Sequence, residues 1–201
     1  MELDWEGCGD LLFRMFQAIT EGAEAGTGFQ ALLEVTANGF RADSGSLALT
    51  LADTGELQVV AALDPSPGQV GRILPAEEGV LGWVVAHGEP LLLQGDASDD
   101  PRFQKLNSQR RRPGSAICWP IRSGNRIIGA LSLNREILAD AFSEDEFRQG
   151  EKLLRLAAVG VDNLRAQAAR ERQVDQFQGL VEAQRELQLV DRQGAQTEEA
   201  V

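Results

Sequence analysis

The sequence predicts an α+β domain in which antiparallel strands form a sheet with one face of large side chains and one face of small ones, with helices at both ends of the chain. Two stretches, 44–63 and 115–133, have the pattern of β-hairpins, and helical apolar repeats occupy both ends of the chain. In both hairpins large side chains alternate with small ones. One face of the predicted sheet is therefore suited to packing, and the other leaves room for a ligand.

The hairpin over 115–133 has its turn at Ser123-Gly124-Asn125. A three-residue loop would pair Arg122 with Arg126 and place Trp119 opposite Gly129, which has no side chain to obstruct the indole. The large face would then hold Ile117, Trp119, Ile121, Ile127, Leu131 and Leu133, and the small face Ala116, Cys118, Pro120, Ile128, Ala130 and Ser132. Both faces are mostly apolar, so we expect cover on both sides.

The elements before this hairpin follow from apolar spacing and turn residues. Helical stripes predict helices over 11–20 and 29–40, with Thr27 as the N-cap of the second. A strand over 44–52 alternates Leu47, Leu49 and Leu51 with small residues, and 57–63 returns after a turn at Asp53-Thr54-Gly55. A short helix over 78–87, a short strand over 90–93 and a polar segment over 95–112 follow. A segment of that length is typical of a functional loop or lid.

A long helix is predicted after the hairpin. Ser143 is a good N-cap, and acidic residues in the first turn complement the helix dipole. Helix formers continue to about Arg192, and the residues expected to point inward are Phe147, Leu153, Leu154, Leu156, Val159, Val161 and Leu164. Beyond them runs a thin apolar stripe that predicts a coiled coil and a parallel homodimer, formed by Val174, Phe177, Val181 and Leu187.

Composition limits the classes of function. Hydrophobic residues make up 43% of 201 residues, enough for a core, and the net charge of −12 argues against binding to nucleic acid or an anionic membrane. No apolar run approaches the ~20 residues of a transmembrane helix, and the N-terminus lacks the pattern of a secretory signal, so we expect a cytoplasmic protein. Cys8 and Cys118 match no metal-ligand spacing.

Three blocks in this order resemble a GAF domain: 78–103 (EGVLGWVVAHGEPLLLQGDASDDPRF), the hairpin over 115–133, and 142–154 (FSEDEFRQGEKLL). The resemblance covers about 27–169, which leaves an N-terminal helix over 1–26, a helical extension over 170–193 and a disordered tail over 194–201. It implies a GAF-like antiparallel sheet with the terminal helices on one face and a pocket on the other, roofed by the short helix and the 95–112 loop. It also implies a small-molecule-sensing regulatory domain.

Small side chains would form the floor of that pocket: Ser46, Ala48, Thr50, Ala116, Cys118, Ala130 and Ser132. Trp83 and Phe103 would lie above the floor and Asp96 near the rim, the usual mixture of apolar walls and a few polar groups. The run Arg110-Arg111-Arg112 is either a solvated salt-bridging segment or a clamp for an anionic ligand. The ligand, and any cofactor, stay unnamed.

The resemblance leaves other functions to weigh. Cyclic-nucleotide-binding members carry an Asn-Lys, Phe, Asp-Glu set, which Asn134-Arg135, Phe142 and Asp145-Glu146 match only loosely. Neither cysteine has the neighbouring His of a bilin attachment site, and His87, the single histidine, is better explained as an exposed helix-end residue than as a haem ligand.

Free methionine-R-sulfoxide reductases are the enzymes of this fold, and they attack with a cysteine in the loop before the central hairpin. Residues 95–114 contain no cysteine, and Cys118 lies within a strand, so we expect no enzyme. Two classes stay open: a ligand sensor, or an adaptor whose pocket is empty and whose helices contact proteins. In either case the output is self-assembly or a separate partner protein.

Overall fold

The computed structural model describes residues 5–22, 24–63, 69–75, 77–95, 100, 113–136 and 139–198, with side chains for all of these except 5, 6, 113, 183 and 185–198. The chain divides into two units, Met1–Leu164 and Arg165–Val201. Helix α5 (Glu144–Glu198) includes most of the predicted disordered tail over 194–201, whereas the predicted lid over 95–112 lies almost wholly outside the described residues. Within those residues, no helix is long and apolar enough to cross a membrane.

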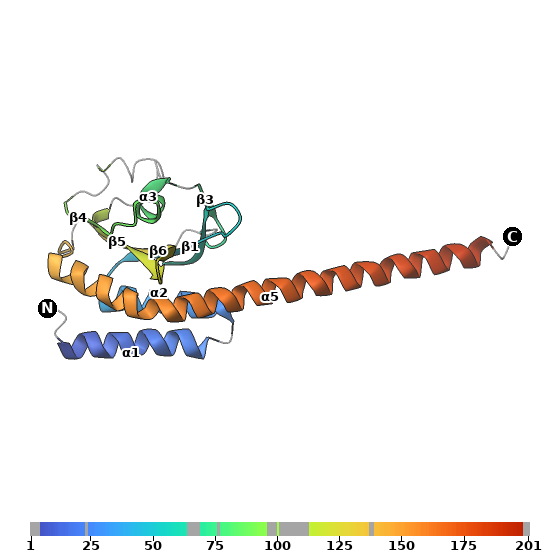
Figure 1. Ribbon diagram of the computed structural model, residues 1–201, viewed down its shortest axis with the longest axis horizontal. Helices are drawn as coiled ribbons and strands as arrows, with labels where there is room; N and C mark the ends of the chain where they lie inside the picture. The colour runs from blue at the N-terminus through green and yellow to red at the C-terminus, as the bar shows by residue number, and fades with distance from the viewer. Residues whose placement is uncertain are drawn as a thin grey trace. The chain divides into compact units, whose positions relative to one another are not determined.

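The first unit is an antiparallel six-stranded sheet between two helical layers, which confirms the predicted α+β class. The strand order is β3-β2-β1-β6-β5-β4. Helices α1, α2 and the start of α5 lie on one side of the sheet and α3 lies on the other (Figure 1). The elements are α1 (Trp5–Glu21), α2 (Ala25–Gly39), β1 (Ser44–Thr50), β2 (Leu57–Leu63), β3 (Ile73–Leu74), α3 (Gly79–His87), β4 (Leu91–Leu93), β5 (Pro113–Ser123), β6 (Arg126–Glu136) and α5 (Glu144–Glu198). The two-residue strand β3 was not predicted.

The register of the central hairpin differs from the prediction. Ser123 pairs with Arg126, so the turn has two residues, and Gly124 takes the positive φ of 60° that such a turn needs at its first position. Trp119 pairs with Leu131 rather than with Gly129. Gly129 instead pairs with Ile121 and Ile127 with Arg122, so Ile128 is the extra residue of a β-bulge.

The bulge also corrects the predicted side of Ile127. A Cβ built on Gly88, the C-cap of α3, would lie 3.1 Å from Ile127 Cδ1, which places Ile127 on the α3 side of the sheet. Gly129 has a different purpose from the predicted one. A Cβ there would collide with the Ala48 carbonyl oxygen and lie 3.1 Å from Leu49 Cα, so the missing side chain lets β6 approach β1.

The helix boundaries bring two further corrections. Thr27 is the third residue of α2 rather than its N-cap; Glu24 is the N-cap, and Thr27 Oγ1 donates to the Glu24 carbonyl oxygen at 2.7 Å. Ser143 is confirmed as the cap of α5, because its Oγ accepts from Glu146 N at 3.1 Å while Glu146 Oε2 accepts from Ser143 N at 2.8 Å. Leu156 and Val159, predicted to point inward, are exposed.

Glycines set how closely the helices pack. A Cβ on Gly160 of α5 would lie 2.6 Å from Ile19 Cδ1 of α1, and a Cβ on Gly39 of α2 would lie equally close to Leu11 Cδ2 of α1. α1 therefore packs against both α2 and α5. α5 is continuous over its 55 residues, although Gly150, Gly160 and Gly179 lie within it.

Candidate functional site

The predicted floor residues share one face of the sheet, the side that α3 covers. The strand register pairs Ala48 with Ala130, Ser46 with Ser132, and Cys118 with Ser132. Ala116 lies two residues before Cys118 on β5, and Thr50 two residues after Ala48 on β1, so both belong to this face as well. The alternation in the sequence thus predicted which side chains come together.

Helix α3 lies directly on the middle of this floor. The residues that pack there form one buried cluster, which we call the α3 cluster: Ala48, Leu57, Val59, Leu74, Val80, Leu81, Val84, Cys118 and Ala130. Small residues on the sheet let a helix with apolar side chains approach closely. The floor at Ala48, Cys118 and Ala130 is therefore covered by protein and is not open to a ligand.

One end of the same face carries polar side chains beside Ala116. Ser44, Ser46, Ser132 and Asn134 lie beyond the α3 cluster, and Ser44 pairs with Asn134 across β1 and β6. We call these four residues the polar end. Asn134 Nδ2 donates to Ser44 Oγ at 3.4 Å, and within the described part of the chain no group donates to the buried Asn134 Oδ1. The polar end therefore offers hydroxyl groups and an amide whose oxygen can still accept a hydrogen bond.

Asn134 and Ser44 are site residues that the sequence reading did not select. The signal was present, because Asn134 continues the alternation of Ala130 and Ser132 along β6. In the sequence analysis Asn134 appears only in the loose match with the cyclic-nucleotide-binding members of the family. Ser44 was read only as the beginning of its strand.

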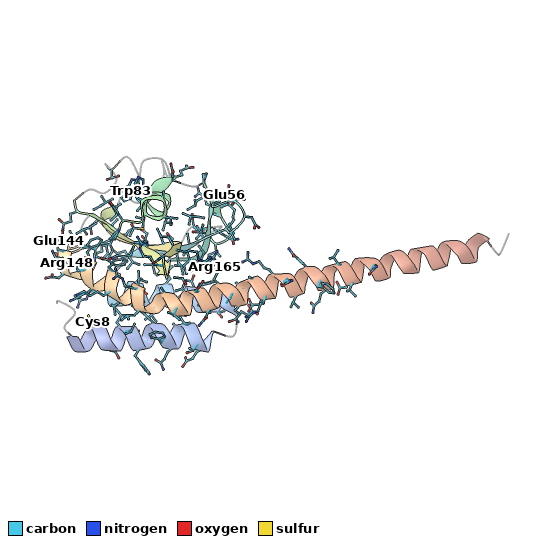
Figure 2. The ribbon with its side chains drawn as sticks, in the orientation of Figure 1. Cys8, Glu56, Trp83, Glu144, Arg148 and Arg165 are labelled. Atoms are coloured by element: carbon cyan, nitrogen blue, oxygen red, sulfur yellow. The ribbon has the colours of Figure 1, made fainter. Side chains whose placement is uncertain are left out.

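Trp83 lies on α3, as labelled in Figure 2, and packs against the edge of the α3 cluster. Its ring stacks on His87 with 4.3 Å between the centroids and 16° between the planes. The His87 Nδ1 lies 2.9 Å from the Trp83 carbonyl oxygen, so the exposed histidine closes the last turn of the helix. Asp96, Phe103 and the run Arg110-Arg111-Arg112 lie outside the described residues.

The two cysteines lie on different layers. Cys8 is on α1, where Figure 2 labels it, whereas Cys118 is fully buried in β5 under α3, and neither forms a disulfide. Burial raises the pKa of Cys118, and a hydrogen bond with Ser132 opposes this only in part. A thiol that stays protonated is a poor nucleophile. Among the described residues no group of three potential metal ligands comes together.

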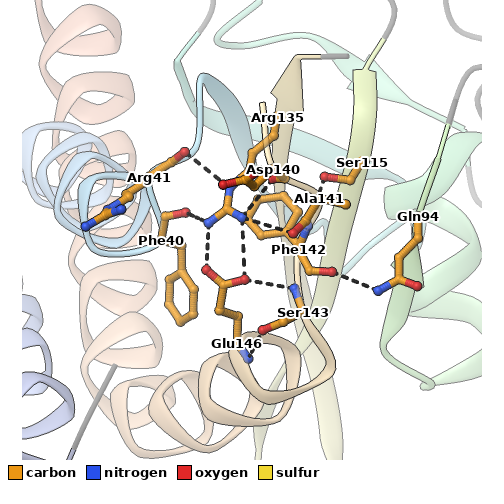
Figure 3. A network of polar contacts seen from close by, with 10 residues as sticks. All are labelled: Phe40, Arg41, Gln94, Ser115, Arg135, Asp140, Ala141, Phe142, Ser143 and Glu146. Atoms are coloured by element: carbon orange, nitrogen blue, oxygen red, sulfur yellow. Dashed lines mark hydrogen bonds and ion pairs between the residues drawn. The ribbon is translucent and has the colours of Figure 1, made fainter. Parts of the chain in front are cut away.

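Three of the residues that loosely match the nucleotide-binding set, Arg135, Phe142 and Glu146, form a structural network on the opposite side of the sheet (Figure 3). Arg135 Nη2 lies 2.6 Å from Glu146 Oε1 and also donates to the Phe40 carbonyl oxygen at 2.6 Å. The guanidinium carbon stands 4.0 Å from the centroid of the Phe142 ring. This network holds α5 against β6 and the end of α2.

A six-stranded antiparallel sheet with helices behind it and a short helix over a small-residue face defines a class of α+β domain. The family model for the GAF domain matches residues 24–161. The chain belongs to the GAF domain family, whose members are generally small-molecule-sensing regulatory domains. None of the proteins with curated descriptions matches this sequence.

Solved GAF-type structures share the fold. The GAF domain of a phosphoenolpyruvate-protein phosphotransferase from Acinetobacter is 22% identical, with a TM-score of 0.66 over 78% of this chain and 93% of that one. Its counterpart from Coxiella burnetii is 20% identical, with a TM-score of 0.69 over 83% and 99%. The free methionine-R-sulfoxide reductase from Neisseria meningitidis, solved with its substrate, is 20% identical, with a TM-score of 0.64 over 79% and 90%.

Proposed function

We propose that this protein is a regulatory sensor that binds a small polar molecule at the polar end of the α3-side face. The observation that carries this proposal is the division of that face. Its apolar half is filled by the α3 cluster, while Ser46, Ser132 and Asn134 present hydrogen-bonding groups on the other half. Few, well-placed polar groups beside an apolar wall are the usual composition of a ligand site.

A catalytic role as a reductase is not part of the proposal. Cys118 is buried with a raised pKa, and Cys8 lies on a helix of the opposite layer. Thiol catalysis needs an accessible thiolate and, to be resolved, a second thiol within reach. The likeness to the reductase structures concerns the fold, at about one-fifth identity.

A cyclic nucleotide is not the ligand that we propose. Arg135 is the cation of the loosely matching set, and its donors are engaged by the carbonyl oxygens of Phe40, Asp140 and Ala141 and by Glu146. The guanidinium thus serves to join secondary-structure elements. A phosphate would have to displace an ion pair of which Arg135 is only 7% exposed.

We also propose that the protein is a parallel homodimer joined through its terminal helices. In the second unit, Val174, Phe177, Leu180 and Val181 are exposed, Phe177 to 70%. In the first unit, α1 exposes Phe13 and Phe16 and α5 exposes Leu156 and Val159. If these large apolar side chains pack against the same helices of a second copy, their apolar surface is removed from water, and this burial stabilises the dimer.

An adaptor is the second candidate, and one observation favours it: α3 packs directly on Ala48, Cys118 and Ala130. In this alternative the face is closed, and the exposed helical surfaces contact a separate partner protein. The two candidates differ in whether the polar end holds a ligand.

Native mass spectrometry of freshly purified protein separates them. A sensor is expected to carry a co-purifying small molecule that Ser132→Leu removes, because the larger side chain fills the polar end. Ser123→Ala provides the control, since Ser123 is a serine at the hairpin turn whose Oγ bonds Asp162 of α5. If no molecule is retained, and metabolite screening gives no thermal shift that Ser132→Leu abolishes, the adaptor is the better account.

A further inference from the structure

Phe142, two residues before α5, is held by side chains from two neighbouring strands (Figure 3). Its backbone N–H donates to Ser115 Oγ of β5 at 3.2 Å. Its carbonyl oxygen accepts from Nε2 of Gln94, the residue directly after β4, at 2.9 Å. Both backbone groups of one residue are thus bound by side chains rather than by the regular ladder of a helix or strand.

The residues on either side are held in the same way. Arg135 Nη1, from β6, donates to the carbonyl oxygens of Asp140 at 3.1 Å and Ala141 at 3.4 Å. Ser143 exchanges two hydrogen bonds with Glu146 and so fixes the first turn of α5. We call 140–143 the junction, because Gln94 after β4 and side chains of β5 and β6 determine its position, and α5 begins at its end.

Strand β4 also contacts the opposite side of the sheet. Leu91 packs against the α3 cluster and pairs with Cys118, a buried member of that cluster. Gln94 follows three residues later and bonds the junction. A displacement of β4 on the α3 side would therefore change the distance between Gln94 and Phe142, since the short strand links the two contacts.

We propose that Gln94 is a positioning residue that transmits changes at the α3-side face to the start of α5. This inference rests on the proposed sensor function, for which it supplies a route from the ligand face to the output helix. Ser115 anchors the junction to β5, and Gln94 makes it responsive to β4. The link uses one hydrogen bond between neutral groups, which is weak enough to break and form during signalling.

The test needs no ligand, because a small cavity can stand in for a change at the α3-side face. Leu91→Val removes one methylene from β4 within the full chain, and amide hydrogen exchange at Phe142 is measured relative to the amide of Leu47, a fully buried residue of β1. Dividing the exchange rate at Phe142 by the rate at Leu47 corrects for any increase in global unfolding. We expect Leu91→Val to raise relative exchange at Phe142 at least about five-fold.

The decisive comparison repeats Leu91→Val in a Gln94→Met background, where the side chain has a similar length but no donor. We expect the effect of Leu91→Val to fall below about two-fold there, since coupling between the two positions requires the bond. Leu57→Val is the matched control. Leu57 belongs to the same α3 cluster, but it lies on β2, which is separated from β4 in the strand order, and it should leave Phe142 unchanged.

Equal effects of Leu91→Val with and without Gln94 would overturn the proposal, as would an equal response to Leu57→Val. If Gln94→Met does not fold, Gln94→Leu or Gln94→Glu serves instead, since neither can donate to the Phe142 carbonyl oxygen. The outcome is independent of ligand binding. Coupling without a co-purifying molecule would contradict only the sensor, and a bound molecule without coupling would contradict only this route.

Discussion

The indole of Trp119 occupies the space that a side chain on Gly150 would fill. A Cβ built on Gly150 would collide with the ring, lying 2.7 Å from its Cε2. Trp119 is completely buried, and its Nε1 donates to the Phe147 carbonyl oxygen at 2.9 Å. The close approach of α5 to the sheet therefore depends on a glycine in the helix and a large ring in the strand.

Gly150→Ala is expected to destabilise the protein, although alanine is the better helix former. The gain in helix propensity is about 0.5–1 kcal/mol, whereas overpacking a filled core costs about 1–3 kcal/mol. The rigid indole cannot move aside without breaking its hydrogen bond to Phe147. Chemical denaturation should show a lower midpoint.

Gly9→Ala is the matched control, because Gly9 lies in α1 with open space around the position of a Cβ. It should raise the free energy of unfolding or leave it unchanged. An equal loss of stability in both variants would mean that the contact with Trp119 is not the cause.

The partner of Trp119 also shows where sequence reasoning reaches its limit. The sequence predicted a glycine against this indole but selected Gly129, across the hairpin. The bulge at Ile128 shifts the register, and the true partner, Gly150, belongs to another layer. Alternation along a strand predicts which face a residue joins, but a contact between layers leaves no periodic signal.

The same limit applies to the candidate site. Alternation correctly grouped Ser46, Ala48, Ala130 and Ser132 on one face, as the register shows. It could not reveal that α3 rests on the middle of that face, because the docking of a helix depends on the packing of the whole domain. The same alternation places Asn134 on this face. It was not selected because Asn134 was interpreted as part of the loosely matching nucleotide-binding set.

Glu146→Gln is expected to lower stability through Arg135. The guanidinium is only 7% exposed, and removing its carboxylate partner leaves a buried charge, which costs about 3 kcal/mol in the general case and less here because Glu146 is partly exposed. Glu144→Gln is the matched control. It also removes one carboxylate from the first turn of α5, but Glu144 is exposed and lies 3.7 Å from Arg148. Similar losses in both variants would contradict a special role for Arg135.

The Arg135–Glu146 pair also predicts a pH dependence. Burial alone would raise the pKa of Glu146, but the hydrogen bonds from Arg135 and Ser143 and the charge of Arg135 together hold it below its ordinary value of 4.5. A depressed pKa means that the unfolded state binds the proton first. The contribution of the ionised Glu146 to the free energy of unfolding is complete above about pH 5. It is lost as the pH falls through the pKa that Glu146 has in the folded state. The free energy of unfolding of Glu146→Gln should therefore decline less steeply between about pH 5 and pH 3 than that of the parent.

Ala130→Leu tests how completely α3 closes the middle of the floor. Ala130 is fully buried in the α3 cluster, so three extra carbon atoms should cost about 1–3 kcal/mol in unfolding experiments. Ser46→Leu places a leucine on the polar end of the same face, where Ser46 is half-buried. It should cost much less and should abolish ligand binding. An unchanged denaturation midpoint for Ala130→Leu would show that the middle of the floor is open.

Phe177→Glu is expected to dissociate the proposed homodimer. Phe177 is 70% exposed within the second unit and stands at helical spacing from Val174 and Val181, so a charge there would place two like charges in the shared seam. Light scattering over a range of concentrations should report a dimer for the parent chain and a monomer for the variant. Gln176→Glu is the control, because it adds the same charge at the preceding residue, which is exposed and lies off the helical face that Val174, Phe177 and Val181 share. Equal dissociation by both variants would mean that net charge, rather than the apolar stripe, governs assembly.

A parent chain that is monomeric at every concentration would refute the dimer itself, and the exposed side chains of α5 would then be a surface for a separate partner protein.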